Sequence, residues 1–393
     1  MLKITNKLLQ LSNISDLQEH SYLSDNFSQN INDYIFFDIE TTGFSYKNSM
    51  CYLIGAIYYN RGFWMYTQWF AVNPSDESEI LNDFVEFSNR YRYIVSFNGE
   101  RFDIPFINGR CELLESDVQL ENINNRSIDI FHIIQPLKNL LNLDNYKQKS
   151  IEEFLGIHRI DKYNGGELIK CYKQYIISKD ESLLNTLLLH NHDDIIGLAN
   201  ITPVLNYMDI INHNISYTAS HQSDYAGYNG DPSSEFIFTF NIPHAVNVPV
   251  NIIKEPFFIN IANNIITVKV NIINDKLKYF YSNYKDYYYI PSEDQAMHKS
   301  VSSYIDKKYR QPAKASNCYV HKAGQFLMQY SNIITPFFKR KYNDNFSYFE
   351  LNDSFINSPD KITDYVLNFE TMCGCLQSSL ICHAPSYISK YKI

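Results

Sequence analysis

The stretch Tyr34-Ile-Phe-Phe-Asp-Ile-Glu-Thr-Thr-Gly43 decides which fold this sequence predicts. Its first four residues are β-formers, typical of a buried strand. Successive side chains of a strand point to opposite faces, so Asp38 and Glu40 lie on the same side. Two neighbouring carboxylates are costly in a packed interior unless a cation neutralises them, and Mg²⁺ prefers carboxylate oxygens. The same pattern also fits two solvated acids at the end of a surface strand, so other residues must decide between the two interpretations.

The composition is that of a globular protein. The chain has 393 residues, enough for two or three domains with cores of their own. Because the net charge is −9, a nucleic-acid partner has to be held by a local basic patch or by metal ions. No apolar run approaches the ~20 residues that span a bilayer, and the first residues lack the apolar centre of a signal peptide. The seven cysteines are mostly scattered, which is typical of reduced thiols, so we expect a cytoplasmic protein without membrane contact.

Strands and helices alternate in the first half of the chain. Asn60-Arg61-Gly62 is a good hairpin turn between two apolar runs, and apolar residues recur at helical spacing over 77–90 and 181–207. The predicted strands are 34–37, 51–59, 63–70, 93–97 and 127–131. The order β-β-β-α-β-α-β-α predicts an α/β fold with a mixed five-stranded sheet and flanking helices.

Composition divides the chain into four predicted segments. Residues 1–33 are polar and predict an arm, and residues 34–211 contain the α/β domain. Turn residues accumulate over 212–231 and predict a linker. Residues 232–393 predict a β-rich accessory domain of the α+β class with an antiparallel meander. The strands of that meander are 236–240, 257–261, 265–273 and 276–281, the last three joined by tight turns at Asn263-Asn264 and Asn274-Asp275. A helix is expected over 292–310.

Two further stretches bring acids to the pair on the first strand. Asp103 follows the strand 93–97, at the expected amino end of a helix. His190 and Asp194 are four residues apart in the helix 181–207 and share one of its faces. Taken singly, Asp103 fits a helix cap and His190 a core histidine. The joint occurrence of four acids favours a metal site; they are Asp38, Glu40, Asp103 and Asp194.

Three motifs carry a resemblance to a known family. They are Phe37-Asp-Ile-Glu-Thr-Thr-Gly43, Phe97-Asn-Gly-x-x-Phe-Asp103 and His190-Asn-x-x-Asp194. Their order and approximate spacing resemble those of the DEDD exonucleases of the ribonuclease-H-like superfamily, and within it the YprB-like branch. The resemblance covers about residues 34–210 and implies a ribonuclease-H-like sheet.

The resemblance also implies roles for individual residues. The metal ligands, for two Mg²⁺ or Mn²⁺ ions, would be Asp38, Glu40, Asp103 and Asp194. His190 would be the general base, since an imidazole titrates near neutrality. The contacts to the terminal nucleotide would be Thr41, Thr42, Gly43, Phe44, Asn98 and Phe102. Asp129 is expected to support the site rather than to bind metal.

Two residues next to His190 and Asp194 are alternatives for the roles of general base and metal ligand. Family members carry a His five residues before the last Asp or a Tyr four before it, and His190 stands at the tyrosine's position. His192 is the alternative base, but it lies about 200° around the helix from Asp194. Asp193 is the alternative ligand; the match at Asn191 favours Asp194.

The function that the resemblance implies is metal-dependent 3′→5′ exonucleolytic hydrolysis at the 3′ end of single-stranded DNA or RNA, by a two-metal-ion mechanism. The alternative is a catalytically weak or inactive protein that binds nucleic-acid ends on the same fold. A ribonuclease-H-like enzyme that cuts internally is disfavoured by the spacing of Asp38 and Glu40 and by the Thr-Thr-Gly that follows. The sequence does not identify a protein partner.

A basic stretch stands out in the accessory domain. Nine Lys or Arg and a single Asp lie between Met297 and Tyr342, a net charge of +8 in an acidic chain. Four tyrosines interleave with them: Tyr304, Tyr309, Tyr319 and Tyr330. Such a stretch predicts a surface that binds a nucleic-acid backbone and stacks bases. A solvated helix face with core tyrosines explains the pattern nearly as well.

Overall fold

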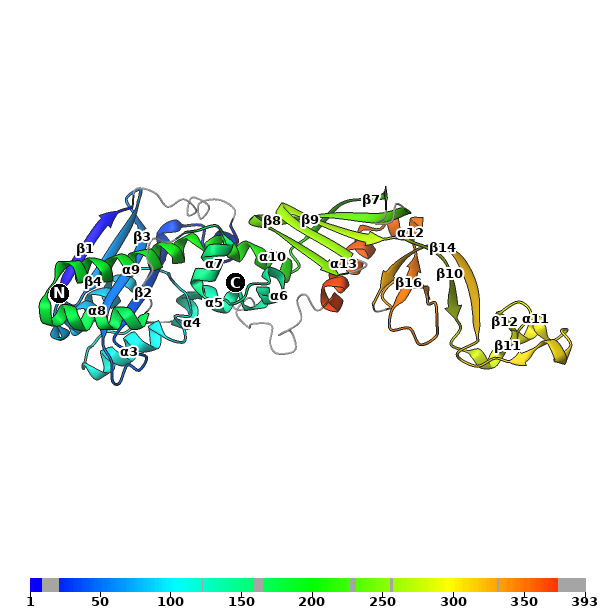
Figure 1. Cartoon of the computed structure of the whole chain (residues 1–393), viewed down its shortest axis with the longest axis horizontal. Helices are drawn as coiled ribbons and strands as arrows, with labels where there is room; N and C mark the ends of the chain where they lie inside the picture. The colour runs from blue at the N-terminus through cyan, green and yellow to red at the C-terminus, as the bar shows by residue number, and fades with distance from the viewer. Residues whose placement is uncertain are drawn as a thin grey trace. The chain divides into compact units, whose positions relative to one another are not determined.

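The computed structural model describes residues 1–8, 21–121, 123–158, 165–226, 231–254, 257–330 and 332–373. They form two compact units (Figure 1). Unit 1 comprises residues 1–212 and 243–248, and unit 2 comprises residues 213–242 and 249–393.

A mixed six-stranded sheet forms the centre of unit 1, with the strand order β1-β4-β3-β2-β5-β6. The pairs β1/β4, β4/β3 and β3/β2 are antiparallel, whereas β2/β5 and β5/β6 are parallel. The strands are β1 (Leu2–Lys7), β2 (Tyr34–Thr41), β3 (Cys51–Asn60), β4 (Phe63–Phe70), β5 (Tyr93–Ser96) and β6 (Ser127–Asp129). The five predicted strands are therefore present in a ribonuclease-H-like sheet, and the sheet has one strand more.

The additional strand, β1, lies in the segment that the sequence predicts to be an arm. It pairs along its whole length with β4 at the edge of the sheet. Most of its side chains are exposed, and Leu2 and Ile4 are only half-buried. An edge strand with polar residues lacks the apolar alternation that predicts a strand.

Helices cover both faces of this sheet. The helices of unit 1 are α1 (Tyr22–Asn26), α2 (Glu77–Ser88), α3 (Asp103–Leu113), α4 (Ile123–Arg126), α5 (Ile130–Ile133), α6 (Lys138–Leu141), α7 (Gln148–Phe154), α8 (Gly165–Ser178), α9 (Glu181–Asn200) and α10 (Met208–Ile211). On one face, Phe84 of α2 packs against Phe37 of β2 and Trp69 of β4, with ring centroids 5.3 and 5.5 Å apart. Helix α9 contacts β2 and β3. Because side chains alternate along β2, the residues next to Phe37 point toward α9.

Gly55 on β3 allows α9 to approach the sheet closely. A Cβ atom at this position would overlap Ile195 Cδ1 and Asn191 Oδ1 of the helix. Gly55 is also the register partner of Asp38 on β2. The absence of a side chain at Gly55 therefore brings the middle of α9 next to the acidic end of β2.

A short part of strand β8 (Pro232–Lys254), residues 243–248, belongs to unit 1. His244 anchors it there, with Nδ1 2.8 Å from Asp209 Oδ2 and Nε2 3.0 Å from Asp25 Oδ2. Burial lowers the pKa of His244, but hydrogen bonds to the two carboxylates raise it more, so the net shift is upward. The two hydrogen bonds of His244 therefore connect α1 and α10 through this strand.

Unit 2 contains three sheets, ordered β7-β8-β9, β10-β14-β16-β15 and β12-β11-β13. Besides β8, its strands are β7 (Ser216–Ala226), β9 (Phe257–Asn271), β10 (Ile273–Phe280), β11 (Tyr287–Ile290), β12 (Gln295–His298), β13 (Gln311–Pro312), β14 (Tyr319–Gln329), β15 (Phe337–Phe338) and β16 (Ser347–Glu350). Its helices are α11 (Lys299–Ser302), α12 (Asp353–Ile356) and α13 (Pro359–Cys373).

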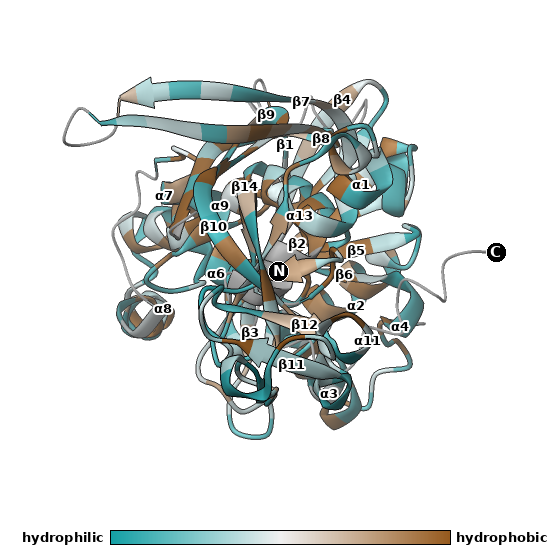
Figure 2. Cartoon of the chain, turned by 90° about the vertical axis from the view of Figure 1, so that its right-hand side faces the viewer, coloured by the Kyte–Doolittle hydropathy of each residue, from teal (hydrophilic) through white to brown (hydrophobic). Residues whose placement is uncertain are grey.

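The structure corrects the predicted strands of the accessory domain. Three strands that follow one another do form a sheet, but they are β7, β8 and β9. The predicted linker contains β7, a mostly exposed and hydrophilic strand (Figure 2). Asn263-Asn264 is not a turn, because β9 continues through it, and β10 pairs with β14 rather than with β9.

The helix predicted over 292–310 is also wrong. This segment contains β12, the four-residue α11 and a 3₁₀ turn at Lys307–Tyr309. Polar side chains that accept hydrogen bonds from nearby backbone N–H groups favour caps and turns over helix interiors. His298 and Asp306 show this effect here, since their side chains accept from the backbone N–H groups of Ser300 and Lys308.

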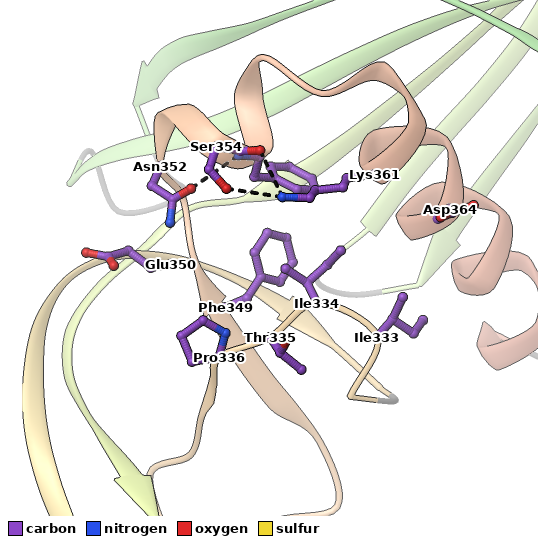
Figure 3. A pocket seen from close by; sticks show the side chains of 11 residues that line it. Ile333, Ile334, Thr335, Pro336, Phe349, Glu350, Asn352, Ser354, Lys361 and Asp364 are labelled. Atoms are coloured by element: carbon purple, nitrogen blue, oxygen red, sulfur yellow. Dashed lines mark hydrogen bonds between the residues drawn. The ribbon is translucent and has the colours of Figure 1, made fainter.

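A cavity of about 240 Å³ lies in unit 2 between the loop 333–336, β16 and the two last helices (Figure 3). Lys361 on α13 donates from Nζ to the backbone oxygen of Ser354 at 3.2 Å and to its Oγ at 3.1 Å. The lysine thus links α12 to α13 and closes one side of the cavity, which gives it a structural role.

Replacing Gly55 by alanine is expected to destabilise unit 1 by about 1–3 kcal/mol, as overpacking of a core does. The new methyl group has to displace Ile195 and Asn191, and Asn191 is held by hydrogen bonds of its own. Chemical denaturation measures the effect. The control is Gly165→Ala, where no atom lies within 4 Å of the added Cβ; equal losses for the two variants would contradict the close packing at Gly55.

Candidate functional site

The acidic pair lies at the carboxyl end of β2 and faces α9. His190 Nε2 is 3.5 Å from Glu40 Oε1 and 3.1 Å from Asp194 Oδ2. Asn191 Nδ2 is 3.3 Å from Asp38 Oδ2. The regular pairing of β2 with β3 shifts between Glu40 and Thr41, so the chain turns away from the sheet directly after the second acid.

Asn191 connects Asp38 on β2 to Gln68 on β4, on the same face of the sheet. It is fully buried, and its Oδ1 accepts from Gln68 Nε2 at 3.0 Å. Gln68 on β4 also donates to the backbone oxygen of Leu188 and accepts from the Tyr66 hydroxyl. This buried chain of neutral amides orients Asp38 without adding a positive charge next to it.

Asp103 is the first residue of α3 and is 6% exposed. Burial raises its pKa well above the ordinary value, and the negative charge of Asp38 raises it further. The backbone N–H of Ile39 donates to Asp103 and acts in the opposite direction. Asp103 therefore lies beside the acids of β2, and the repulsion between Asp38 and Asp103 is of the kind that a cation relieves.

The remaining acids approach from α9 and the end of β2. One ligand atom from each of Glu40, His190 and Asp194 lies within 4.8 Å of the others. The site thus combines carboxylates from three elements with one imidazole. Carboxylate oxygens are the donors that Mg²⁺ and Mn²⁺ prefer, so the donor set fits these ions.

The two competing residues on α9 lie elsewhere. The ring of His192 packs edge-on against Tyr66, with centroids 4.9 Å apart. His192 Nδ1 is 3.4 Å from Asp193 Oδ1. The structure therefore places His190 and Asp194 with Glu40, and His192 with Asp193 and Tyr66.

Asp129 supports the loop that leads into Asp103. Its carboxylate accepts from the N–H groups of Asn98 at 2.8 Å, Glu100 at 3.2 Å and His132 at 3.3 Å. Burial raises the pKa of Asp129 in spite of these three donors. Asn98 adopts a left-handed backbone conformation with φ +65°, which asparagine tolerates better than most residues. Asp129 therefore stabilises the turn between β5 and α3.

A loop with an exposed phenylalanine follows the acidic pair. Thr41 Oγ1 donates to the Gly43 oxygen at 2.9 Å, and Thr42 exchanges hydrogen bonds with Met50 at 2.9 and 3.0 Å. These bonds close the loop and leave Phe44 93% exposed. The only ring contact recorded for Phe44 among the described residues is an edge-on one with Phe102, at 6.4 Å between centroids.

Sequence reasoning missed an ion pair that holds this loop. Arg110 Nε and Nη2 donate to the two carboxylate oxygens of Glu77 at 2.8 and 2.6 Å, and Arg110 Nη1 donates to the Tyr46 oxygen at 2.9 Å. Glu77 Oε1 also accepts from the N–H of Cys51 at 2.8 Å. Because α2 and α3 contribute one partner each, no local motif signals the pair.

The chain is similar to known proteins over part of its length. Residues 35–206 match the family RNase_H_2, described as the RNase_H superfamily. A search of curated protein sequences found no match. Among solved structures, the family B DNA polymerase from the archaeon Pyrobaculum calidifontis is 14% identical, with a TM-score of 0.35 over 44% of this chain and 25% of that one. E. coli exonuclease I in complex with a 5cy-dA13 oligonucleotide is 9% identical, with a TM-score of 0.31 over 54% of this chain and 55% of that one. The chain thus spans about a quarter and about half of these proteins.

Truncating Arg110 to alanine is expected to cost about 3–5 kcal/mol, because it leaves the carboxylate of Glu77 buried without its counter-charge. Arg110 and Glu77 are 14% and 5% exposed, so solvent screens the pair little. Adding Glu77→Gln to Arg110→Ala is expected to recover part of the loss, since glutamine keeps an acceptor for Cys51 but carries no charge.

Chemical denaturation of the two single variants and the double variant measures this coupling. The exposed Arg90→Ala is the control and is expected to change stability by less than about 0.5 kcal/mol. Losses that simply add in the double variant would contradict a buried, coupled pair.

Proposed function

Because residues 35–206 match the RNase_H superfamily, we propose that this protein is a metal-dependent 3′→5′ exonuclease of the DEDD type, acting at DNA or RNA ends. The observations that support the proposal are that Glu40 of β2 lies within 4.8 Å of His190 and Asp194 of α9, and that Asp103 of α3 is influenced by the charge of Asp38, also on β2. The proposed ligands are Asp38, Glu40, Asp103 and Asp194.

The acids suit two Mg²⁺ or Mn²⁺ ions, whose four positive charges match four carboxylates. When bound, such ions acidify a water molecule and stabilise the leaving 3′ oxygen of a phosphodiester. The protein's own contribution is to hold the ligands in place before the substrate arrives. Asn191 does so for Asp38, and the N–H of Ile39 does so for Asp103.

His190 is the proposed general base. Its Nε2 lies within reach of Glu40 and Asp194, so the imidazole stands at the edge of the acidic cluster. A neutral imidazole there takes a proton from an attacking water and returns it to solvent. The same contacts allow the alternative role of a further ligand, which experiment separates from that of a base.

The loop after β2 and the turn before α3 are proposed to hold the terminal nucleotide. Phe44 is exposed and its ring lies edge-on to that of Phe102, so it offers a face or an edge for the last base. The proposed contacts are Thr41, Thr42, Gly43, Phe44, Asn98 and Phe102. The proposed substrate is the 3′ end of a single strand.

Two finer assignments belong to this proposal. Membership of the YprB-like branch rests on the three motifs. A cytoplasmic location rests on cysteines that are not joined in disulfides, among them Cys51, Cys111 and Cys318. No helix within the described residues is both long and apolar enough to cross a bilayer.

Asp38→Asn is expected to lower the rate of cleavage at least about 100-fold, because it removes a ligand charge from the metal site. The assay uses 5′-labelled single-stranded DNA, duplex DNA and RNA with Mg²⁺, Mn²⁺ or EDTA. A ladder that shortens from the 3′ end, absent with EDTA and with the variant, supports the proposal. The exposed Asp117→Asn is the matched control and should cleave normally. Binding of ends without any cleavage by the unaltered protein would favour an end-binding protein instead.

His190→Ala is expected to slow cleavage about 10²–10⁴-fold, the usual contribution of a general base. If His190 acts as a base, Mn²⁺ should still raise the thermal midpoint of the variant, since the four carboxylates remain. Loss of the Mn²⁺-dependent shift would instead identify His190 as a ligand. An unchanged rate would refute both roles.

A further inference from the structure

A short basic loop in unit 2 is held rigid from within. It runs from Lys299 to Arg310 and contains α11 and the 3₁₀ turn at Lys307–Tyr309 (Figure 1). Ser302, which is fully buried, donates from Oγ to the His298 oxygen at 2.9 Å. Arg310 Nη1 donates to the backbone oxygen of Ser302 at 2.6 Å. The backbone of this loop is therefore organised before any partner binds.

The side chains that this loop presents outward are large and exposed. Tyr304 is 92% exposed, Val301 63% and Tyr309 57%. Two nearby tyrosines pack inward instead: Tyr281 and Tyr287 stack at 4.6 Å between centroids. A rigid loop that keeps aromatic side chains in solvent gains nothing from them in the folded protein, and exposed apolar groups of this kind mark binding surfaces.

Cations lie next to Tyr309 of this loop and next to Tyr288 of the neighbouring strand β11. The guanidinium of Arg310 lies 4.5 Å from the ring centre of Tyr288, and Lys299 Nζ lies 5.5 Å from the same ring. Lys308 Nζ lies 4.8 Å from the ring centre of Tyr309. Between positions 299 and 314 the chain carries five Lys or Arg and only one acid, Asp306. The loop is thus a positive site on a protein whose net charge is −9.

We propose that the loop Lys299–Arg310 is a second binding site for single-stranded nucleic acid. Its cations contact backbone phosphates, and Tyr304 and Tyr309 stack on bases. Alternating cations and aromatic rings match a strand that alternates phosphates and bases, which an acidic peptide does not. The inference rests on the proposed function for its class of partner, and it assigns to unit 2 the task of holding the substrate strand away from the reacting end.

Fluorescence anisotropy of the full chain in EDTA tests the site without cleavage, using labelled oligothymidylate and oligouridylate of about 20 nucleotides over a series of salt concentrations. Removing two cations with Lys307→Ala/Lys308→Ala should lower the slope of log affinity against log salt by about 1.4, or 0.7 for each phosphate contact to a single strand. Tyr304→Ala should weaken binding about tenfold, whereas Tyr304→Phe should keep the unaltered affinity, because stacking needs only the ring.

The matched control is Lys170→Ala/Lys173→Ala, which removes two exposed lysines from α8 of unit 1 and should leave the slope unchanged. An unchanged slope in the double variant of the loop, or equal losses in the two double variants, would overturn the proposal. Thermal unfolding verifies that the variants remain folded, as expected for exposed positions. The two oligonucleotides distinguish DNA from RNA.

The outcome is separable from that of the proposed function. Cleavage without any effect of the loop variants on affinity would refute the site and leave the exonuclease standing. Binding that depends on the loop, without any cleavage, would support the site and refute the exonuclease.

Discussion

The close contact between α9 and the sheet at Gly55 is the constraint on which the candidate site depends. Helix side chains normally hold a helix well above a sheet, but Gly55 leaves room for Asn191 and Ile195 to reach the strand backbone. Asp38 is the register partner of Gly55, so the same contact brings Asn191 to Asp38. His190 directly precedes Asn191 in α9 and Asp194 lies one turn further on, and both approach Glu40.

The acids gathered in this way are costly for the fold. Burial and the charge of Asp38 raise the pKa of Asp103, and three backbone donors do not prevent burial from raising that of Asp129. Gln68 and Asn191 supply neutral hydrogen bonds to the site, whereas the charged Arg110 is bound to Glu77. Like charges that lie close together lower the stability of the folded protein, and sites that contain them are generally functional.

The sequence predicts the parts of this architecture that local patterns specify. The strands around Asp38 are apolar runs bounded by turns, and the acids stand at fixed places beside them, so both could be read from spacing. Strand β1 could not be predicted, because an exposed edge strand has no apolar period. The ion pair of Arg110 and Glu77 could not be predicted either, since these residues are 33 positions apart and lie in different helices. In unit 2, Asn263-Asn264 is typical of a turn, yet exposed positions of a long strand accept it.

The position of His190 couples the proposed base to a proposed metal ligand, Asp194. A residue four positions before Asp194 lies on the same helix face, whereas one five positions before it is rotated by about 140°. A histidine at the latter position must reach the site from the flank of the helix, independently of the last acid. His190 instead contacts Asp194 across one turn and Glu40 across the gap to β2. Any shift of α9 on the sheet therefore moves base and ligand together, so the packing at Gly55 controls both.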